Sequence, residues 1–135
     1  MVANELENVG VTPESGKAVL IVEDEFNTRR ALSRLLAMHG YYPVTAASAE
    51  EALRIIGHQP LPRTILVDLD LPGMDGMSFI RLVISRKKAT VPIVISSHDG
   101  KEIAAAAGGL PVRYLPKPLD FSSLLNLLGN YPPLH

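Results

Sequence analysis

Side chains suited to phosphate and metal chemistry follow four apolar runs of this chain, at the point where each run ends. They are Glu23 and Asp24 after the first run, Asp68 after a later one, Ser97 after the next and Lys117 just beyond the last. Carboxylate oxygens bind divalent cations, while an amine and a hydroxyl stabilise the negative charge of a phosphoryl group. An Asp carboxylate can itself attack phosphorus and form an aspartyl phosphate. These residue types therefore indicate metal-assisted phosphoryl transfer, provided that the fold brings them together.

The charges of these groups do not balance. Glu23, Asp24 and Asp68 contribute negative charge, and Lys117 returns a single positive charge. Two carboxylates about 4 Å apart repel each other by ~4 kcal/mol at an effective dielectric constant of about 20. A divalent cation relieves this repulsion, and Mg²⁺ fits because it accepts one or two carboxylates together with waters and phosphate oxygens. Protonation of one carboxyl group is the other remedy.

The elements that must position these groups follow two hydrophobic patterns. Short continuous apolar runs are typical of strands buried on both faces, and apolar residues at helical spacing separate them. The predicted strands are residues 18–22, 43–46, 64–67, 92–95 and 112–115. The predicted helices cover about residues 31–38, 48–56, 77–88, 99–107 and the segment after Asp120. Five strands that alternate with five helices predict an α/β fold with a parallel sheet and helices on both faces.

Local signals set the ends of the predicted helices. Ser48 and Glu51 match a capping box, and Asp99 and Asp120 are predicted N-caps. The apolar positions predicted to face inward on the first helix are Ala31, Leu32, Leu35, Leu36 and Met38. In a doubly wound sheet, sites form at the carboxyl ends of the strands. The four groups of polar residues are therefore expected on one edge of the sheet.

Composition limits the class of protein further. The chain has 135 residues, which suits one domain, and 13 Lys and Arg against 14 Asp and Glu argue against nucleic-acid binding through bulk charge. It has no cysteine, so no disulfide or zinc-thiolate site is expected. No apolar run approaches the roughly 18 residues of a membrane helix, and the start resembles no secretory signal. A cytoplasmic protein is the expectation.

Four sequence pieces, in order and spacing, resemble the receiver domain of bacterial two-component response regulators. They are VLIVEDE at 19–25, ILVDLDLPGMDG at 65–76, PIVISS at 92–97 and YLPKP at 114–118. The resemblance runs from about Lys17 to Leu128. It implies a flavodoxin-like, doubly wound five-stranded parallel sheet with strand order 2-1-3-4-5. We expect a receiver domain at 17–129, a flexible N-terminal extension at 1–16 and a short tail at 130–135.

The resemblance also implies roles for individual residues at the phosphorylation site. Asp68, four residues before Pro72, resembles the phospho-acceptor. Glu23 and Asp24 resemble the acidic pair that holds Mg²⁺, although Asp is common at the position of Glu23. The backbone carbonyl of Asp70 is implied as a further metal ligand. Its side chain is expected to be a solvent-facing loop acid.

Residues in and after the last two predicted strands carry the implied switch. Ser97, five residues after Pro92, resembles the switch hydroxyl, although Ser96 is its neighbour. Lys117 resembles the lysine that pairs with phosphate, and a cis peptide bond is implied at Pro118. Tyr114 resembles the aromatic switch that turns inward on activation. His98 stands where a small residue is usual, so we expect it to restrict access and alter phosphorylation kinetics.

The family implies a phosphorylation-driven switch rather than an enzyme. The expected donor is a sensor histidine kinase or a histidine phosphotransfer protein, and the expected output is a protein target whose identity the sequence does not give. We expect no direct contact with nucleic acid, because no DNA-binding segment follows residue 130, and none with a membrane, because no apolar run is long enough to cross one. A receiver that is part of a longer protein would show the same pattern.

Two other classes remain open at this stage. Asp68 and Asp70 resemble the nucleophile and acid-base pair of a haloacid-dehalogenase-type phosphatase. That class needs acidic metal ligands after its lysine, and only Asp120 follows Lys117. The other class is a receiver-like interaction module that works without phosphate. A nucleotide or flavin binder is disfavoured because the first strand leads into EDEFN instead of a glycine-rich loop.

Overall fold

The computed structural model describes residues 17–58, 60–70, 75–86 and 90–129. The predicted extension at 1–16 and tail at 130–135 lie outside these residues. The described part contains a five-stranded parallel sheet with strand order β2-β1-β3-β4-β5. The strands are β1 (Ala18–Val22), β2 (Tyr42–Ala46), β3 (Thr64–Asp68), β4 (Val91–Ser96) and β5 (Arg113–Pro116). The predicted fold class and strand order are confirmed.

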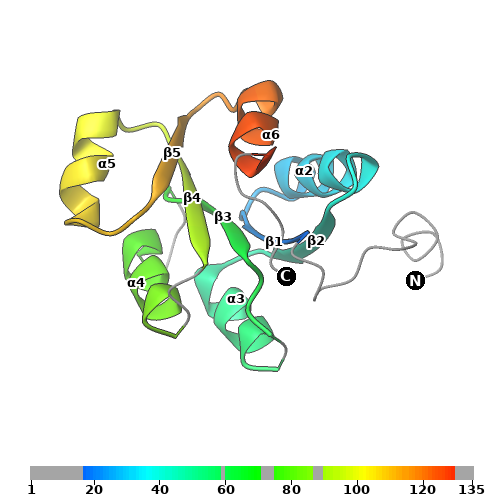
Figure 1. Cartoon of the computed structure of the whole chain (residues 1–135), viewed down its shortest axis with the longest axis horizontal. Helices are drawn as coiled ribbons and strands as arrows, with labels where there is room; N and C mark the ends of the chain where they lie inside the picture. Colours follow the sequence, from blue (N-terminus) through cyan, green and yellow to red (C-terminus); the bar gives the residue numbers. More distant parts are fainter. Residues whose placement is uncertain (1–16, 59, 71–74, 87–89, 130–135) are drawn as a thin grey trace.

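Helices cover both faces of this sheet (Figure 1). They are α2 (Phe26–Met38), α3 (Ala49–Ile56), α4 (Gly76–Arg86), α5 (Gly100–Ala107) and α6 (Phe121–Gly129). Helices α2 and α6 pack against one face, and α3, α4 and α5 pack against the other. None of the helices in the described ranges is long and apolar enough to cross a membrane.

The central strands are continuous apolar runs because both of their faces are covered. In β1, Val19 and Ile21 pack toward α2 and α6, whereas Leu20 and Val22 pack toward the other helical layer. All four side chains are buried. Alternate residues of a strand point to opposite faces, so both core layers share the same strands. This packing fixes the strand ends that carry the polar residues.

Two helix starts differ in how their caps are built. The Ser48 hydroxyl accepts the Glu51 N–H at 3.0 Å, as predicted for α3. The Glu51 carboxylate, however, accepts the N–H of Ala47 rather than that of Ser48, so only half of the predicted capping box forms. At α5 the box is complete, because Asp99 accepts the Glu102 N–H and Glu102 accepts the Asp99 N–H.

Helix α2 corrects part of the predicted inward face. Leu32 and Leu36 are buried, as expected. Ala31 is exposed, and Met38 is 77% exposed. Met38 lies two residues beyond Leu36, which is about 200° around a helix of 3.6 residues per turn. It therefore points away from the sheet, and the prediction was wrong for both residues.

Candidate functional site

The groups predicted to meet at the carboxyl edge of the sheet do lie there. Asp68 is the last residue of β3, and Glu23 directly follows β1. Lys117 directly follows β5, where its backbone N–H donates to the Ser96 carbonyl at 3.0 Å. Because β1, β3, β4 and β5 are successive strands of one parallel sheet, their ends form a continuous edge.

Glu23, Asp24 and Asp68, here called the acidic cluster, bring three carboxylates together. Each offers one oxygen, and these oxygens all lie within 4.8 Å of one another. Glu23 is 5% exposed and Asp68 3% exposed, whereas Asp24 is exposed to solvent. Burial, reinforced by the nearby charge of Asp68, raises the pKa of Glu23 to about 7, although the Glu25 N–H donates to it at 3.0 Å. The donor set and the spacing suit a hard divalent cation.

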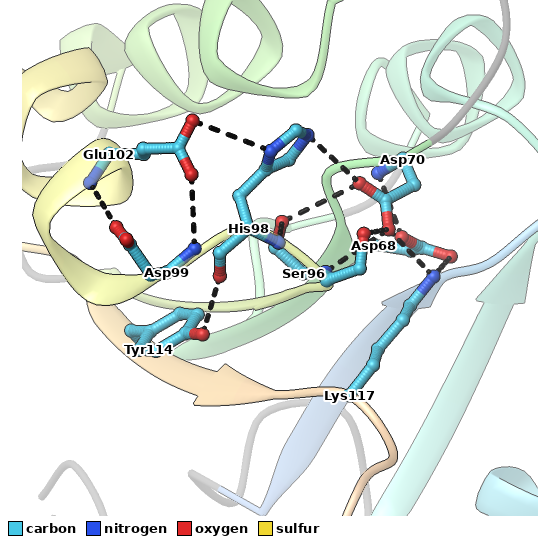
Figure 2. A network of polar contacts seen from close by, with 9 residues as sticks. Asp68, Asp70, Ser96, His98, Asp99, Glu102, Tyr114 and Lys117 are labelled. Atoms are coloured by element: carbon cyan, nitrogen blue, oxygen red, sulfur yellow. Dashed lines mark hydrogen bonds and ion pairs between the residues drawn. The ribbon is translucent and has the colours of Figure 1, made fainter.

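Lys117 supplies a positive charge next to Asp68 (Figure 2). Its Nζ lies 3.0 Å from Asp68 Oδ2 and 3.1 Å from Asp70 Oδ2. Partial burial acts to lower the pKa of Lys117, but its hydrogen bonds to Asp68 and Asp70 outweigh that effect and raise it. The amine is therefore charged at neutral pH and shared between two carboxylates.

The side chain of Asp70 has partners that the sequence did not predict. The residue is exposed, as expected, but its side chain keeps only 26% of its accessible surface and its carboxylate accepts hydrogen bonds from Ser97. Burial acts to raise its pKa, but the bonds from Lys117 and Ser97 lower it below the usual value. Asp70, Ser97 and Lys117 are here called the paired network. Spacing along a loop does not fix side-chain direction, although the excess of acids over lysines at this edge was a signal for such pairing.

Ser96, the last residue of β4, and Ser97, which follows it, have different surroundings. Ser96 is fully buried, and its hydroxyl accepts the His98 N–H at 3.0 Å. Ser97 is exposed, and its hydroxyl donates to Asp70 at 3.1 Å. Both hydroxyls donate to Asp70, because Ser96 Oγ lies 3.5 Å from Asp70 Oδ1, but it is Ser97 that shares the Oδ2 oxygen with Lys117. The His98 ring lies between Asp70 and Glu102, with N–O separations of 3.9 Å and 3.7 Å (Figure 2).

Tyr114 is tied to the same loop by its hydroxyl group. The ring is partly buried against the core layer of α3, α4 and α5. Its hydroxyl donates to the His98 carbonyl at 2.6 Å, which connects β5 to the backbone that follows Ser97. The Lys117–Pro118 peptide bond is cis, as the resemblance implied.

Comparison with known protein families shows which family has this arrangement of site residues. The model of the response regulator receiver domain matches residues 19–129. The chain belongs to this family. The match includes every residue of the acidic cluster and the paired network. A response regulator receiver is a signalling switch in a phosphorelay, so the predicted function class is confirmed.

Individual relatives agree with this assignment. The chain is 36% identical over 110 residues to a probable transcriptional regulator ycf27 of Guillardia theta, an alignment that covers 79% of this chain and 42% of that protein. It is 34% identical over 113 residues to a putative NtrX-like response regulator of Rickettsia bellii, covering 82% of this chain and 23% of that protein. The chain thus spans less than half the length of these relatives.

A solved structure shows the same fold. The response regulator receiver protein of Pseudomonas putida superimposes with a TM-score of 0.77 at 31% sequence identity, covering 84% of this chain and 96% of that one.

The phosphatase and phosphate-independent alternatives are not favoured by these relationships. Asp120, the only acid after Lys117, bonds the Ser123 hydroxyl at 2.7 Å at the start of α6. It is therefore used in a helix cap.

Proposed function

We propose that Asp68 is the residue of this receiver that accepts the phosphoryl group. The observation that carries the proposal is that its carboxylate lies close to both kinds of charge. One of its oxygens lies within 4.8 Å of a carboxylate oxygen of Glu23 and of Asp24, and Oδ2 lies 3.0 Å from Lys117 Nζ. At 3% exposure, Asp68 is largely shielded from water. This strengthens both its attraction to Lys117 and its repulsion from the other two carboxylates.

The proposed donor is a phosphohistidine on a sensor histidine kinase or on a histidine phosphotransfer protein. A carboxylate oxygen of Asp68 attacks phosphorus, and the bond between phosphorus and the imidazole nitrogen breaks. The nitrogen keeps the electron pair of that bond, and the phosphoryl group becomes an acyl phosphate on Asp68. Lys117 then balances part of the added negative charge. In this sense the chain promotes only its own phosphorylation and dephosphorylation.

We propose Mg²⁺ as the cofactor, held by Glu23, Asp24, Asp68 and the backbone carbonyl of Asp70. The fit is supported by the acidic cluster itself, in which three carboxylates lack enough positive charge and Glu23 has a pKa of about 7. A bound cation supplies the positive charge that the attacking and transferred oxygens need. Glu23 would release its proton to serve as a ligand.

The proposed output is a change at Ser97 and Tyr114. The Ser97 hydroxyl would donate to the phosphoryl group, and Tyr114 would move with the backbone of His98, to which it is bonded. Such a change shifts an existing equilibrium between conformations. We propose that a partner protein reads it at α5, β5 and α6. His98, beside the site and 60% exposed, would restrict the approach of donor and water.

Intact-mass measurement after treatment with acetyl phosphate tests the assignment of Asp68. We expect the wild-type chain to gain one phosphoryl group with Mg²⁺ and almost none with a chelator. Asp68→Asn should abolish the gain. Asp75→Asn is the matched control, because Asp75 is an exposed acid that bonds Ser78 at a helix start, a role that Asn can keep. Undiminished labelling of Asp68→Asn would refute the proposal.

A turnover assay separates the proposal from the phosphatase alternative. That alternative needs Asp70 as an acid-base group, but its carboxylate is held by Lys117 and Ser97. We expect no turnover of phosphate monoesters by the wild-type chain. Catalytic release of phosphate that depends on Asp70 would revive the phosphatase.

A further inference from the structure

A single carboxylate oxygen gathers three hydrogen-bond donors beside Asp68. Asp70 Oδ2 lies 3.1 Å from Lys117 Nζ, 3.1 Å from Ser97 Oγ and 3.3 Å from the Ser97 backbone nitrogen. Its other oxygen, Oδ1, lies 3.5 Å from Ser96 Oγ and 3.9 Å from His98 Nε2. Figure 2 shows these contacts converging on Asp70 from the ends of β4 and β5.

These donors come from separate elements, and their convergence forms an anion-binding site. A positive amine, a hydroxyl and a backbone N–H are the groups that stabilise oxygens with negative charge. Lys117 and Ser97 are also the residues proposed above to contact the phosphoryl group on Asp68. The internal carboxylate of Asp70 therefore uses the same donors that the incoming group requires.

The two anions cannot keep these donors at the same time without a large penalty. Asp70 is two residues from Asp68, and its backbone N–H donates to Asp68 Oδ1 at 2.8 Å, so the two side chains start from neighbouring points. Like charges about 4 Å apart repel by ~4 kcal/mol at an effective dielectric constant of about 20. A phosphoryl group carries more negative charge than a carboxylate, so repulsion favours departure of one anion.

We propose that the Asp70 carboxylate is a built-in competitor that occupies the phosphoryl-binding donors Ser97 and Lys117 until Asp68 is phosphorylated. Phosphorylation would then exchange one anion for another at these donors. Ser97 is held toward the site before activation, and Asp70 is released to solvent afterwards.

This inference rests on the proposed function, and it predicts tighter binding when the competitor is removed. Beryllofluoride with Mg²⁺ serves as the probe, because it mimics a phosphoryl group without forming a stable acyl phosphate. The Ser97 amide resonance of the isotope-labelled full chain reports both the contact and the binding. We expect Asp70→Ala to bind beryllofluoride about tenfold more tightly than wild type, the factor that one charge-assisted hydrogen bond gives.

Matched variants separate competition from loss of charge in general. Asp70→Asn keeps the shape of the side chain, so we expect an intermediate affinity, and Asp75→Asn should match wild type. In the free protein, the Ser97 amide resonance should move in Asp70→Ala and stay in place in Asp75→Asn. Thermal unfolding of each variant confirms that it is folded.

Three outcomes are distinguishable. Tighter binding by Asp70→Ala together with a moved Ser97 resonance supports the competition. Equal or weaker binding by Asp70→Ala, with normal binding by wild type, overturns it and leaves the proposed function intact. Absence of binding by wild type and by both Asp70 variants overturns the proposed function, and the competition with it.

Discussion

The acidic cluster and the paired network lie on the same edge of one sheet, but they balance charge differently. In the acidic cluster three carboxylates lie within 4.8 Å of one another, and the buried Glu23 has a pKa of about 7. In the paired network Lys117 and Ser97 donate to Asp70, whose pKa is lowered. The three carboxylates of the first region contact one amine, which Asp68 shares with Asp70, whereas in the second region a single carboxylate receives both the amine and the Ser97 donors.

This difference indicates a division of labour around Asp68, the residue at which the two regions meet. Missing charge is a reason to bind a cation, so the acidic cluster suits the metal. Donors that already bind one anion can release it and bind another, so the paired network suits a switch. Replacing residues in one region should therefore leave the property of the other largely unchanged.

The largest effect is expected from removing the charged amine of Lys117 from the paired network. Lys117→Ala should slow phosphorylation by acetyl phosphate at least about a hundredfold, because Lys117 is the amine placed against Asp68. The time course of intact mass with Mg²⁺ measures the rate. Lys101→Ala, at an exposed position of α5, is the matched control and should react like wild type. An unchanged rate for Lys117→Ala would show that the paired network is not part of the chemistry.

The next effect is the pH dependence of stability without metal. The folded chain holds a proton on Glu23 up to a pH of about 7, its folded-state pKa, whereas the unfolded chain releases it near the ordinary glutamate pKa of 4.5. The folded state thus binds more protons between these values, and its stability falls as pH rises through them. Denaturant unfolding in the presence of a chelator should show a loss of roughly 3 kcal/mol in the free energy of unfolding from this group.

Glu23→Gln provides the control for this pH dependence. The amide of Gln cannot titrate. Between pH 4.5 and pH 7, the free energy of unfolding of this variant should therefore fall less than that of wild type, by the loss attributed to Glu23. Equal pH profiles for the two proteins would contradict a raised pKa for Glu23. Asp70 does not interfere, because its pKa is lowered and its contribution changes only at more acidic pH.

A smaller effect is expected for metal affinity. Glu23→Gln should weaken Mg²⁺ binding about tenfold, the cost of losing one charged ligand contact of ordinary strength. Calorimetric titration at a pH above 7 measures the affinity. Asp75→Asn, which removes a charge outside the acidic cluster, should bind like wild type. Equal affinity for Glu23→Gln and wild type would remove Glu23 from the metal site.

The smallest effect concerns the helix that follows the paired network. Asp99→Ala removes the complete capping box of α5 and should lower the free energy of unfolding by about 1 kcal/mol. Denaturant unfolding measures this change. Its Mg²⁺ affinity should equal that of wild type, because α5 makes no contribution to the acidic cluster. A loss of metal affinity would show that the two regions are coupled more tightly than their contacts indicate.

The sequence predicted the sheet because its signals are local and strong. Continuous apolar runs ended by charged residues mark β1 and β3, and both strands were placed within one residue of their observed ends. The site residues followed from the same signal, because the ends of neighbouring parallel strands meet at one edge. The predictions were wrong where they depended on the direction of a single side chain, as for Met38 on α2.

Asp70 shows why the sequence could not predict such side-chain directions. Its carboxylate bonds Ser97, which is 27 residues further along the chain, and Lys117 from another strand end. Nothing in the local sequence fixes a loop side chain toward such distant partners. Glu25 is a similar case, because its carboxylate accepts the N–H groups of Asn27 and Thr28 and caps α2. Charge counting gave only the type of site, and the pairing within it depended on the fold.

Reductive trapping of the phosphorylated chain tests the central claim most directly. Borohydride converts an aspartyl phosphate to homoserine, and peptide mass spectrometry then locates the converted residue. After treatment with acetyl phosphate and Mg²⁺, the account predicts conversion at Asp68 and loss of that signal in Asp68→Asn. Conversion at Asp24, Asp70 or Asp75 in place of Asp68 would contradict it.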